Sequence, residues 1–120
     1  MQGKTVQLED LGLGRFAIKG DMSFQTAQFL LERSEDLFED HTEIEVDMIS
    51  VTRTDSAGLA LMLEWINWAN HSVREIRFEN VPAKIRSIAR ATEVEHLLSV
   101  GERWTGFIEQ TMAEDPEPDA

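Results

Sequence analysis

The chain has 120 residues, a formal net charge of −12 at pH 7 and no cysteine. This length suits one domain with a single core. The negative charge argues against binding nucleic acid or anionic lipid headgroups, which both attract basic surfaces. The lack of cysteine excludes disulfides and thiolate metal sites.

No targeting or membrane segment is visible in the sequence. Residues 1–6 run into acidic positions without the apolar stretch of a signal peptide. The longest apolar stretch, residues 59–69, is interrupted by Glu64 and Asn67 and is shorter than the roughly 20 residues of a membrane span. We therefore expect a cytoplasmic protein with no direct membrane span.

The first elements predict a β-hairpin. Residues 5–8 and 15–19 alternate polar and apolar side chains, as half-buried strands do. Between them, residues 12–17 match the loose dinucleotide-binding pattern GxGxxA. That pattern needs a helix directly after its glycines, to direct N–H groups at a pyrophosphate. Because a strand is expected there, the nucleotide interpretation is rejected.

A helix is predicted from an N-cap at Ser23 to about Glu39. Its apolar positions form one stripe at helical spacing: Ala27, Leu30, Leu31, Leu37 and Phe38. Acidic residues lie outside that stripe: Glu32, Glu35, Asp36, Glu39 and Asp40. A solvated acidic face is the favoured interpretation, and a metal site the weaker alternative, since no histidine accompanies them.

The middle of the chain predicts a strand over 43–48, which continues or turns at 49–51, a loop over 52–54 and a helix over 56–70. This helix has two apolar stripes. One suits packing on a sheet, and the second contains Leu61, Trp65 and Trp68. The favoured explanation of the second stripe is cover by another helix of the same domain. The alternative is a surface for a partner, where tryptophan is enriched.

The remaining residues predict a strand over 76–79 and a helix that follows Pro82. That helix carries the one basic patch, formed by Lys84, Arg86 and Arg90. It is interpreted as a solvated face near carboxylates, or alternatively as a contact for an acidic partner segment. A short helix or strand at 94–100 closes the core, a terminal helix is expected within 102–111, and 112–120 reads as an acidic disordered tail.

No residue set predicts catalysis, a cofactor or a metal. Ser56 lacks the GxSxG context of a nucleophile elbow, since Thr54 occupies the first glycine position. The three histidines, His41, His71 and His96, are scattered without ligand spacing. We therefore expect a protein that is not an enzyme.

The element order β-β-α-β-α-β-α predicts an α/β fold, with a mixed sheet of about four or five strands and helices largely on one face. At the junction before the most apolar helix stand Asp55, Ser56 and Gly58. Asp and Ser side chains can accept from the free N–H groups of a helix start, and the helix dipole favours an anion there. The junction is therefore either a capped helix start or a recognition point.

The segment VTRTDSAGLALMLEW, residues 51–65, followed by Trp68 and Ala69, resembles the STAS domain family of sulfate transporters and anti-sigma factor antagonists. Its longer apolar run is most similar to the STAS subunits of Mla-type phospholipid-transport ABC systems. The resemblance implies a STAS domain over residues 1–101. It also implies a non-catalytic accessory subunit that binds an ABC transporter ATPase, within a complex of permease and substrate-binding subunits that maintains outer-membrane lipid asymmetry.

The same resemblance implies a partner-binding surface, and the positions that match it are Thr54, Asp55, Ser56, Ala57, Gly58, Leu61, Trp65 and Trp68. In anti-sigma factor antagonists the serine that a kinase phosphorylates directly precedes the glycine. Ala57 stands at that position and has no hydroxyl. Ser56, one residue earlier, is left as a possible phosphorylation site. An antagonist in a partner-switching module is the alternative function.

Overall fold

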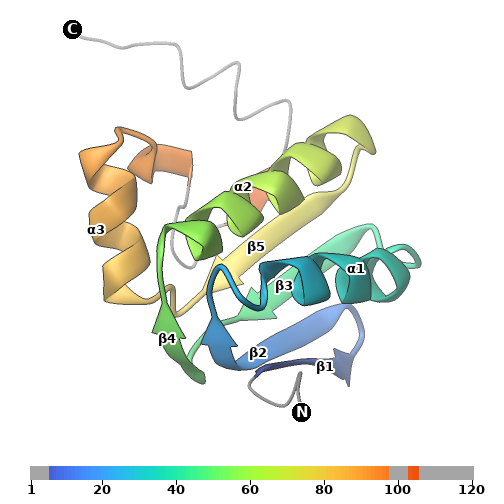
Figure 1. Cartoon of the computed structure of the whole chain (residues 1–120). Coiled ribbons are helices and arrows are strands. Elements are labelled where there is room, and N and C mark those ends of the chain that lie inside the picture. The colour runs from blue at the N-terminus through green and yellow to red at the C-terminus, as the bar shows by residue number, and fades with distance from the viewer. Residues whose placement is uncertain (1–5, 98–102, 106–120) are drawn as a thin grey trace, which may run out of the picture.

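The computed structural model describes residues 6–97 and 103–105, and they form one sheet with helices beside it (Figure 1). The strands are β1 (Val6–Gly12), β2 (Arg15–Met22), β3 (Glu43–Asp47), β4 (Val51–Thr54), β5 (Glu75–Glu79) and β6 (Arg103–Thr105). The helices are α1 (Ala27–Phe38), α2 (Ser56–His71), α3 (Ala83–Ala91) and the short 3₁₀ helix η1 (Glu95–Leu97).

The main path of the sheet runs β1-β2-β3-β5-β6. The pairs β2–β3 and β3–β5 are parallel, whereas the outer pairs β1–β2 and β5–β6 are antiparallel. Strand β4 lies off this path and pairs in parallel with the second half of β2, beyond the end of β3. Because β2 and β4 are parallel, the residues that follow both strands emerge at the same edge of the sheet.

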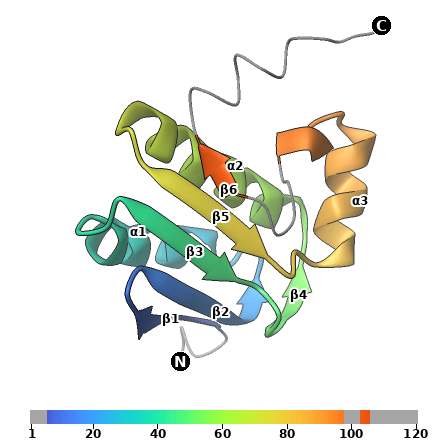
Figure 2. The same ribbon diagram turned by 180° about the vertical axis from the view of Figure 1, so that it is seen from behind.

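Helices α1 and α2 cover one face of the sheet, and α3 lies at its side near β4 (Figure 1). Seen from behind, β3 and β5 have no helix over them (Figure 2). The sequence explains this asymmetry, because side chains alternate between faces along a strand. In β3, Ile44 and Val46 are buried while the intervening Glu45 is partly exposed. The expected α/β fold with helices largely on one face is confirmed.

The core is organised around a chain of aromatic rings that joins four elements. Phe16 of β2 lies 5.0 Å from Phe38 of α1, and Phe38 lies 5.5 Å from Trp65 of α2. Trp65 in turn stacks on Phe78 of β5 at 6.4 Å. Rings at these separations attract one another beyond the burial of their area. Through these contacts the two helices and the sheet share one core.

The indole N–H of Trp65 has a partner inside this core. It donates to the hydroxyl of Ser34 at 2.8 Å, and that hydroxyl donates to the carbonyl of Leu31 at 2.7 Å. Ser34 and Trp65 are each only 2% exposed. A buried donor without an acceptor costs about 1–3 kcal/mol, so this hydrogen bond is what allows a tryptophan at this position.

The hairpin over the first two strands is confirmed, with a turn at Gly12, Leu13 and Gly14. All three residues have positive φ, which glycine adopts freely. At Gly14 an added Cβ would also lie 2.5 Å from the carbonyl oxygen of Glu43. Strand β2 follows the turn directly, so these glycines serve the hairpin and the dinucleotide pattern is incidental.

Three element boundaries differ from the sequence expectation. Helix α1 begins at Ala27 because Ser23 to Thr26 form a turn, in which the Thr26 hydroxyl accepts from Ser23 N–H. The segment 52–54, expected as a loop, belongs to β4, since it finds a partner in β2. A helix is expected within 102–111, but this prediction is wrong for residues 103–105, which form strand β6 and pair with β5. The other residues of that range lie outside the described part of the chain.

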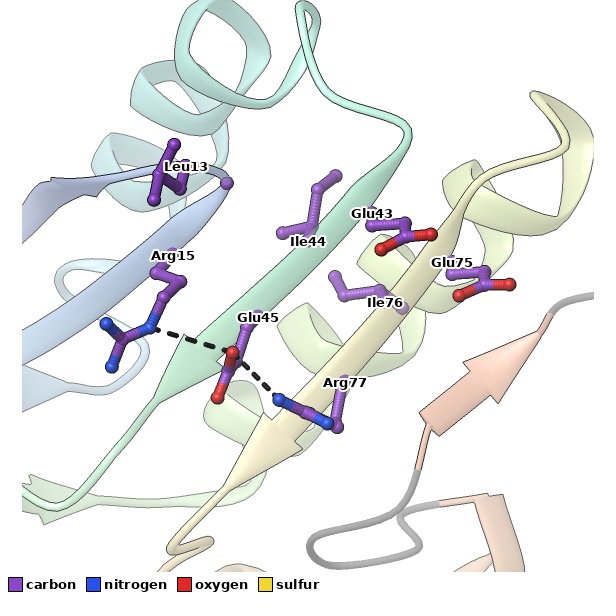
Figure 3. A pocket seen from close by; sticks show the side chains of 9 residues that line it. Leu13, Arg15, Glu43, Ile44, Glu45, Glu75, Ile76 and Arg77 are labelled. Carbon is purple, nitrogen blue, oxygen red and sulfur yellow. Dashed lines mark ion pairs between the residues drawn. The ribbon is translucent and has the colours of Figure 1, made fainter.

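On the open face, one glutamate lies between two arginines from neighbouring strands (Figure 3). Glu45 accepts from Arg77 at 2.8 Å and lies 3.7 Å from Arg15. A hydrogen bond between Glu45 and Glu79 raises the pKa of Glu79, with burial and the Glu45 charge adding to it. The same hydrogen bond lowers the pKa of Glu45. Burial of Glu45 opposes this lowering, and the nearby Arg77 adds to it. The two carboxyls therefore share one proton on acidification.

Ser34→Ala should lower the free energy of unfolding by about 1–2 kcal/mol, because the buried Trp65 N–H loses its acceptor. Urea denaturation measures this. The double variant Ser34→Ala/Trp65→Phe should lose less than the sum of the single variants, since it removes both partners. Ser87→Ala, at an exposed position of α3, is the matched control and should stay within about 0.5 kcal/mol of the parent. Additive single effects would contradict the assigned hydrogen bond.

Glu79→Gln should stabilise the protein near pH 7, by about 0.5 kcal/mol, because the amide donates to Glu45 without adding a second negative charge. Folding raises the pKa of Glu79 above its ordinary value of 4.5, so the protonated side chain stabilises the folded protein at pH values below 4.5. This stabilisation is lost as the pH rises through the pKa of the folded state. The advantage of Gln should therefore shrink as pH falls through that range. Thermal melts between pH 4 and 8 measure it. Glu79→Ala lacks the donor and should gain less, and an advantage independent of pH would contradict the shared proton.

Candidate functional site

The β4–α2 junction begins with a capped helix. Asp55 has an extended backbone, with φ −151° and ψ −166°, and one oxygen of its carboxylate accepts from the N–H of Ala57 at 2.9 Å. Its carbonyl accepts from the N–H of Gly58 at 2.9 Å. Asp55 thus satisfies groups that a helix start leaves free, and its negative charge suits the positive end of the helix dipole.

The second carboxylate oxygen of Asp55 binds a different part of the chain. It accepts from the N–H of Phe24 at 3.2 Å, in the turn between β2 and α1. The parallel pairing of Met22 with Thr54 explains why these segments meet, since both strands end at one edge of the sheet. One carboxylate therefore fixes the start of α2 and the β2–α1 turn relative to each other.

Gly58 allows α2 to approach the sheet closely. It is buried, and a Cβ at this position would lie 3.0 Å from the carbonyl oxygen of Met22 and would collide with the hydroxyl of Thr54. A backbone carbonyl cannot rotate away as a side chain can. Gly58 is therefore required for the close packing of α2 against Met22 and the buried Thr54.

The outward side of the junction is small and polar on α2 and apolar on the neighbouring turn. Ser56 is exposed, and Ala57 is partly buried. Phe24 is 80% exposed, although Asp55 holds its backbone. An exposed phenylalanine beside a helix start carries an unfavourable hydration free energy, which burial against a binding partner would remove. Phe24, Ser56 and Ala57 define what we name the junction surface.

Four of the eight predicted partner-binding positions are buried in the domain. Leu61 is 4% exposed and Trp65 is 2% exposed, so both side chains belong to the core of the domain, and their contact with a partner stays a prediction. Thr54 and Gly58 are buried as well. Trp65 is buried because α1 covers it, through the ring of Phe38 and the hydroxyl of Ser34. Cover by another helix of the same domain is the explanation that the sequence favours for the second apolar stripe of α2.

Trp68 lies between these extremes. It is partly buried against Phe38, at a ring separation of 6.1 Å, and the guanidinium of Arg74 lies 4.6 Å from its ring centre. Arg74 is held there by hydrogen bonds to the carbonyls of Glu39 and His41. Trp68 is therefore remote from the junction surface and lines the boundary between α1 and α2.

Sequence reasoning missed Phe24 as a functional candidate and Ser34 as the partner of Trp65. The sequence pattern predicts a helix with its N-cap at Ser23, which would put Phe24 in the first turn of that helix. No local signal in the sequence marks Phe24, because only the parallel pairing of β2 with β4 brings the residues after both strands to one edge of the sheet. Ser34 gives no signal in sequence beyond being a polar residue at a helix position that faces the core.

The other groups considered in the sequence do not form a chemical site. Arg86 and Arg90 of the basic patch both lie near Glu95, at 3.8 and 3.0 Å, as the solvated-face interpretation expected. Within residues 6–97, no three His, Asp or Glu side chains gather as metal ligands. Among the described helices, none has the length and apolarity needed to cross a membrane.

The fold has relatives among solved structures. SpoIIAA, an anti-sigma factor antagonist in its unphosphorylated form, superposes with a TM-score of 0.56 at 18% identity, over 71% of this chain and 81% of its own. A putative anti-sigma factor antagonist from Thermotoga maritima gives 0.65 at 12% identity, over 92% and 94%. One from Mycobacterium paratuberculosis gives 0.63 at 15%, over 91% and 92%. At these identities the likeness concerns the fold.

A comparison with curated proteins found no significant match. The family comparison is positive: the model described as "Mlab, STAS domain" matches residues 10–99, three quarters of the chain, including every strand and helix from β2 to α3. The resemblance found in residues 51–69 therefore extends over residues 10–99, and the chain belongs to the MlaB-type STAS domain family.

Proposed function

We propose that the chain is a non-catalytic STAS accessory subunit that binds the ATPase of an Mla-type ABC transporter and stabilises or regulates it. The observation that carries this proposal is the junction surface, where an exposed Phe24 stands beside Ser56 on a backbone fixed by Asp55. An aromatic side chain has only two rotatable bonds, so it loses little entropy on binding for the area that it buries, which makes it a good anchor for a standing contact.

The absence of a hydroxyl at Ala57 favours a standing contact over a phosphorylation switch. Antagonists of this family are switched at the residue directly before the glycine, which here cannot be phosphorylated. A phosphate on Ser56 would lie next to the Asp55 carboxylate, which already accepts two backbone N–H groups. At the helix start the Ala57 N–H is already bonded to Asp55, and a phosphate on Ser56 would meet the like charge of that carboxylate.

The mechanism follows from binding thermodynamics. A domain without catalytic groups changes ATPase activity only by binding one conformation of the ATPase more tightly than another. In this role it would act from the cytoplasmic side and reach the inner membrane through the ATPase and permease. The complex, with its substrate-binding subunit, would move phospholipids and so maintain outer-membrane lipid asymmetry. A net charge of −12 would speed association with a basic ATPase surface, an effect that salt weakens.

The second candidate function, an anti-sigma factor antagonist, rests on one feature of the same surface. Ser56 keeps an exposed hydroxyl one residue from the usual acceptor position. In that case a kinase-like anti-sigma factor would bind the junction surface and phosphorylate Ser56. The two functions differ in the partner that the surface retains.

Phe24→Ser should weaken binding to the ATPase by about 30-fold, the loss of about 2 kcal/mol that a central aromatic anchor typically gives, without lowering thermal stability. Ser56→Arg should also weaken it, since a long charged side chain would obstruct the contact. Co-purification with co-expressed ATPase and permease from the same organism, followed by titration, measures both effects.

Matched controls lie at other places on the surface. Leu13→Ser changes a residue that is 96% exposed at the opposite end of β2, and Ser87→Arg places the same charge on α3. Both should bind as the parent does. Unchanged recovery of the ATPase by Phe24→Ser and Ser56→Arg would disprove the proposed contact. Retention of an anti-sigma factor by the parent, and no ATPase, would favour the second function.

A further inference from the structure

A second feature of the surface is a groove between α1 and α2, which run beside each other over the sheet (Figure 1). It contains a cavity of about 120 Å³. Phe38, Trp65 and Ser34 form its buried part, while Leu31 and Trp68 are partly exposed. Trp65 follows Ser56 by nine residues, or about 14 Å along a helix, so the groove is separate from the junction surface.

The cavity suits an apolar group. Its buried polar atoms already have partners, because Trp65 donates to Ser34 and Ser34 donates to the carbonyl of Leu31. The other lining at this depth is aromatic and aliphatic carbon. An apolar protein cavity of about 150 Å³ accepts benzene, so this volume has room for one aliphatic side chain.

The opening of the cavity carries negative charge. Glu35 of α1 and Glu64 of α2 are both exposed and line it from either helix. Neither forms an ion pair with another residue of the described part. Helix α1 has one base, Arg33, against Glu32, Glu35 and Asp36.

From this combination we propose that the α1–α2 groove binds a basic amphipathic helix of a partner protein. One aliphatic side chain of that helix enters the cavity between Leu31 and Trp68. Lysine or arginine residues one turn to either side pair with Glu35 and Glu64, since positions three or four apart share one face of a helix. The inference does not depend on which protein binds the junction surface.

The test uses the full chain and a synthetic amphipathic helix of leucine and lysine as the probe. Binding should shift the NMR signals of the Trp65 and Trp68 side-chain N–H groups, since both tryptophans line the cavity. A leucine–glutamate peptide of equal length should not bind, and polylysine of equal length should bind at least fivefold more weakly, because it cannot fill the cavity. Equal affinity for polylysine, or unchanged signals from both tryptophans, would overturn the proposal.

Variants separate the groove from the general attraction of an acidic protein for cations. Glu35→Gln/Glu64→Gln should weaken binding of the leucine–lysine peptide by roughly fivefold or more. Asp36→Asn/Asp40→Asn makes the same change in net charge at exposed positions outside the cavity lining, and should stay within about twofold of the parent. All four positions are on the surface, so thermal melts should show folded proteins. Equal weakening in both pairs would show that only net charge matters and would reject the groove.

Discussion

The carboxylate of Asp55 is the interaction on which the candidate site depends. One oxygen caps α2 and the other holds the backbone of Phe24, so two segments 31 residues apart in sequence are fixed by a single side chain. Gly58 completes the arrangement, because the absence of a side chain lets α2 start directly against the carbonyl of Met22. These local requirements account for the Asp and Gly of the motif without any catalytic role. What remains free for recognition is the outward side, occupied by Ser56, Ala57 and Phe24.

Much of this fold could be predicted from sequence because its signals are local. The alternation of charged and apolar residues in 43–48 and 76–79 predicts the two central strands. The same alternation puts the charged side chains on the open face of the sheet. The start of α2 was predicted to the residue, since Asp before a helical pattern is a strong cap. The element boundaries that the sequence did not predict depend on which strands pair with each other. Residues 52–54 become a strand only because β2 extends past the end of β3, which no pattern within those residues records.

The site was predicted less well than the fold, for a related reason. The wide apolar arc of α2 was visible in sequence, but its division between core and surface is decided by α1. Phe38 and Ser34 take Trp65 into the core. Phe24, by contrast, looked like an ordinary apolar residue at a helix start. Only the path of β2 beside β4 brings it next to Asp55, and only the late start of α1 leaves it in water.

The junction surface and the α1–α2 groove lie on the same helix, and this has a consequence for regulation. Helix α2 is anchored at its start by Asp55 and along its length by Trp65, which contacts α1 through Phe38 and the sheet through Phe78. A helix fixed at several places moves as one body with its domain.

A partner bound at the junction surface and a second segment bound in the groove are therefore held at a set separation. If both belong to one complex, the second contact becomes intramolecular once the first has formed, and the domain gains affinity without any conformational change of its own. Under the proposed function, such a domain would favour the ATPase conformation in which the two partner segments fit that fixed separation.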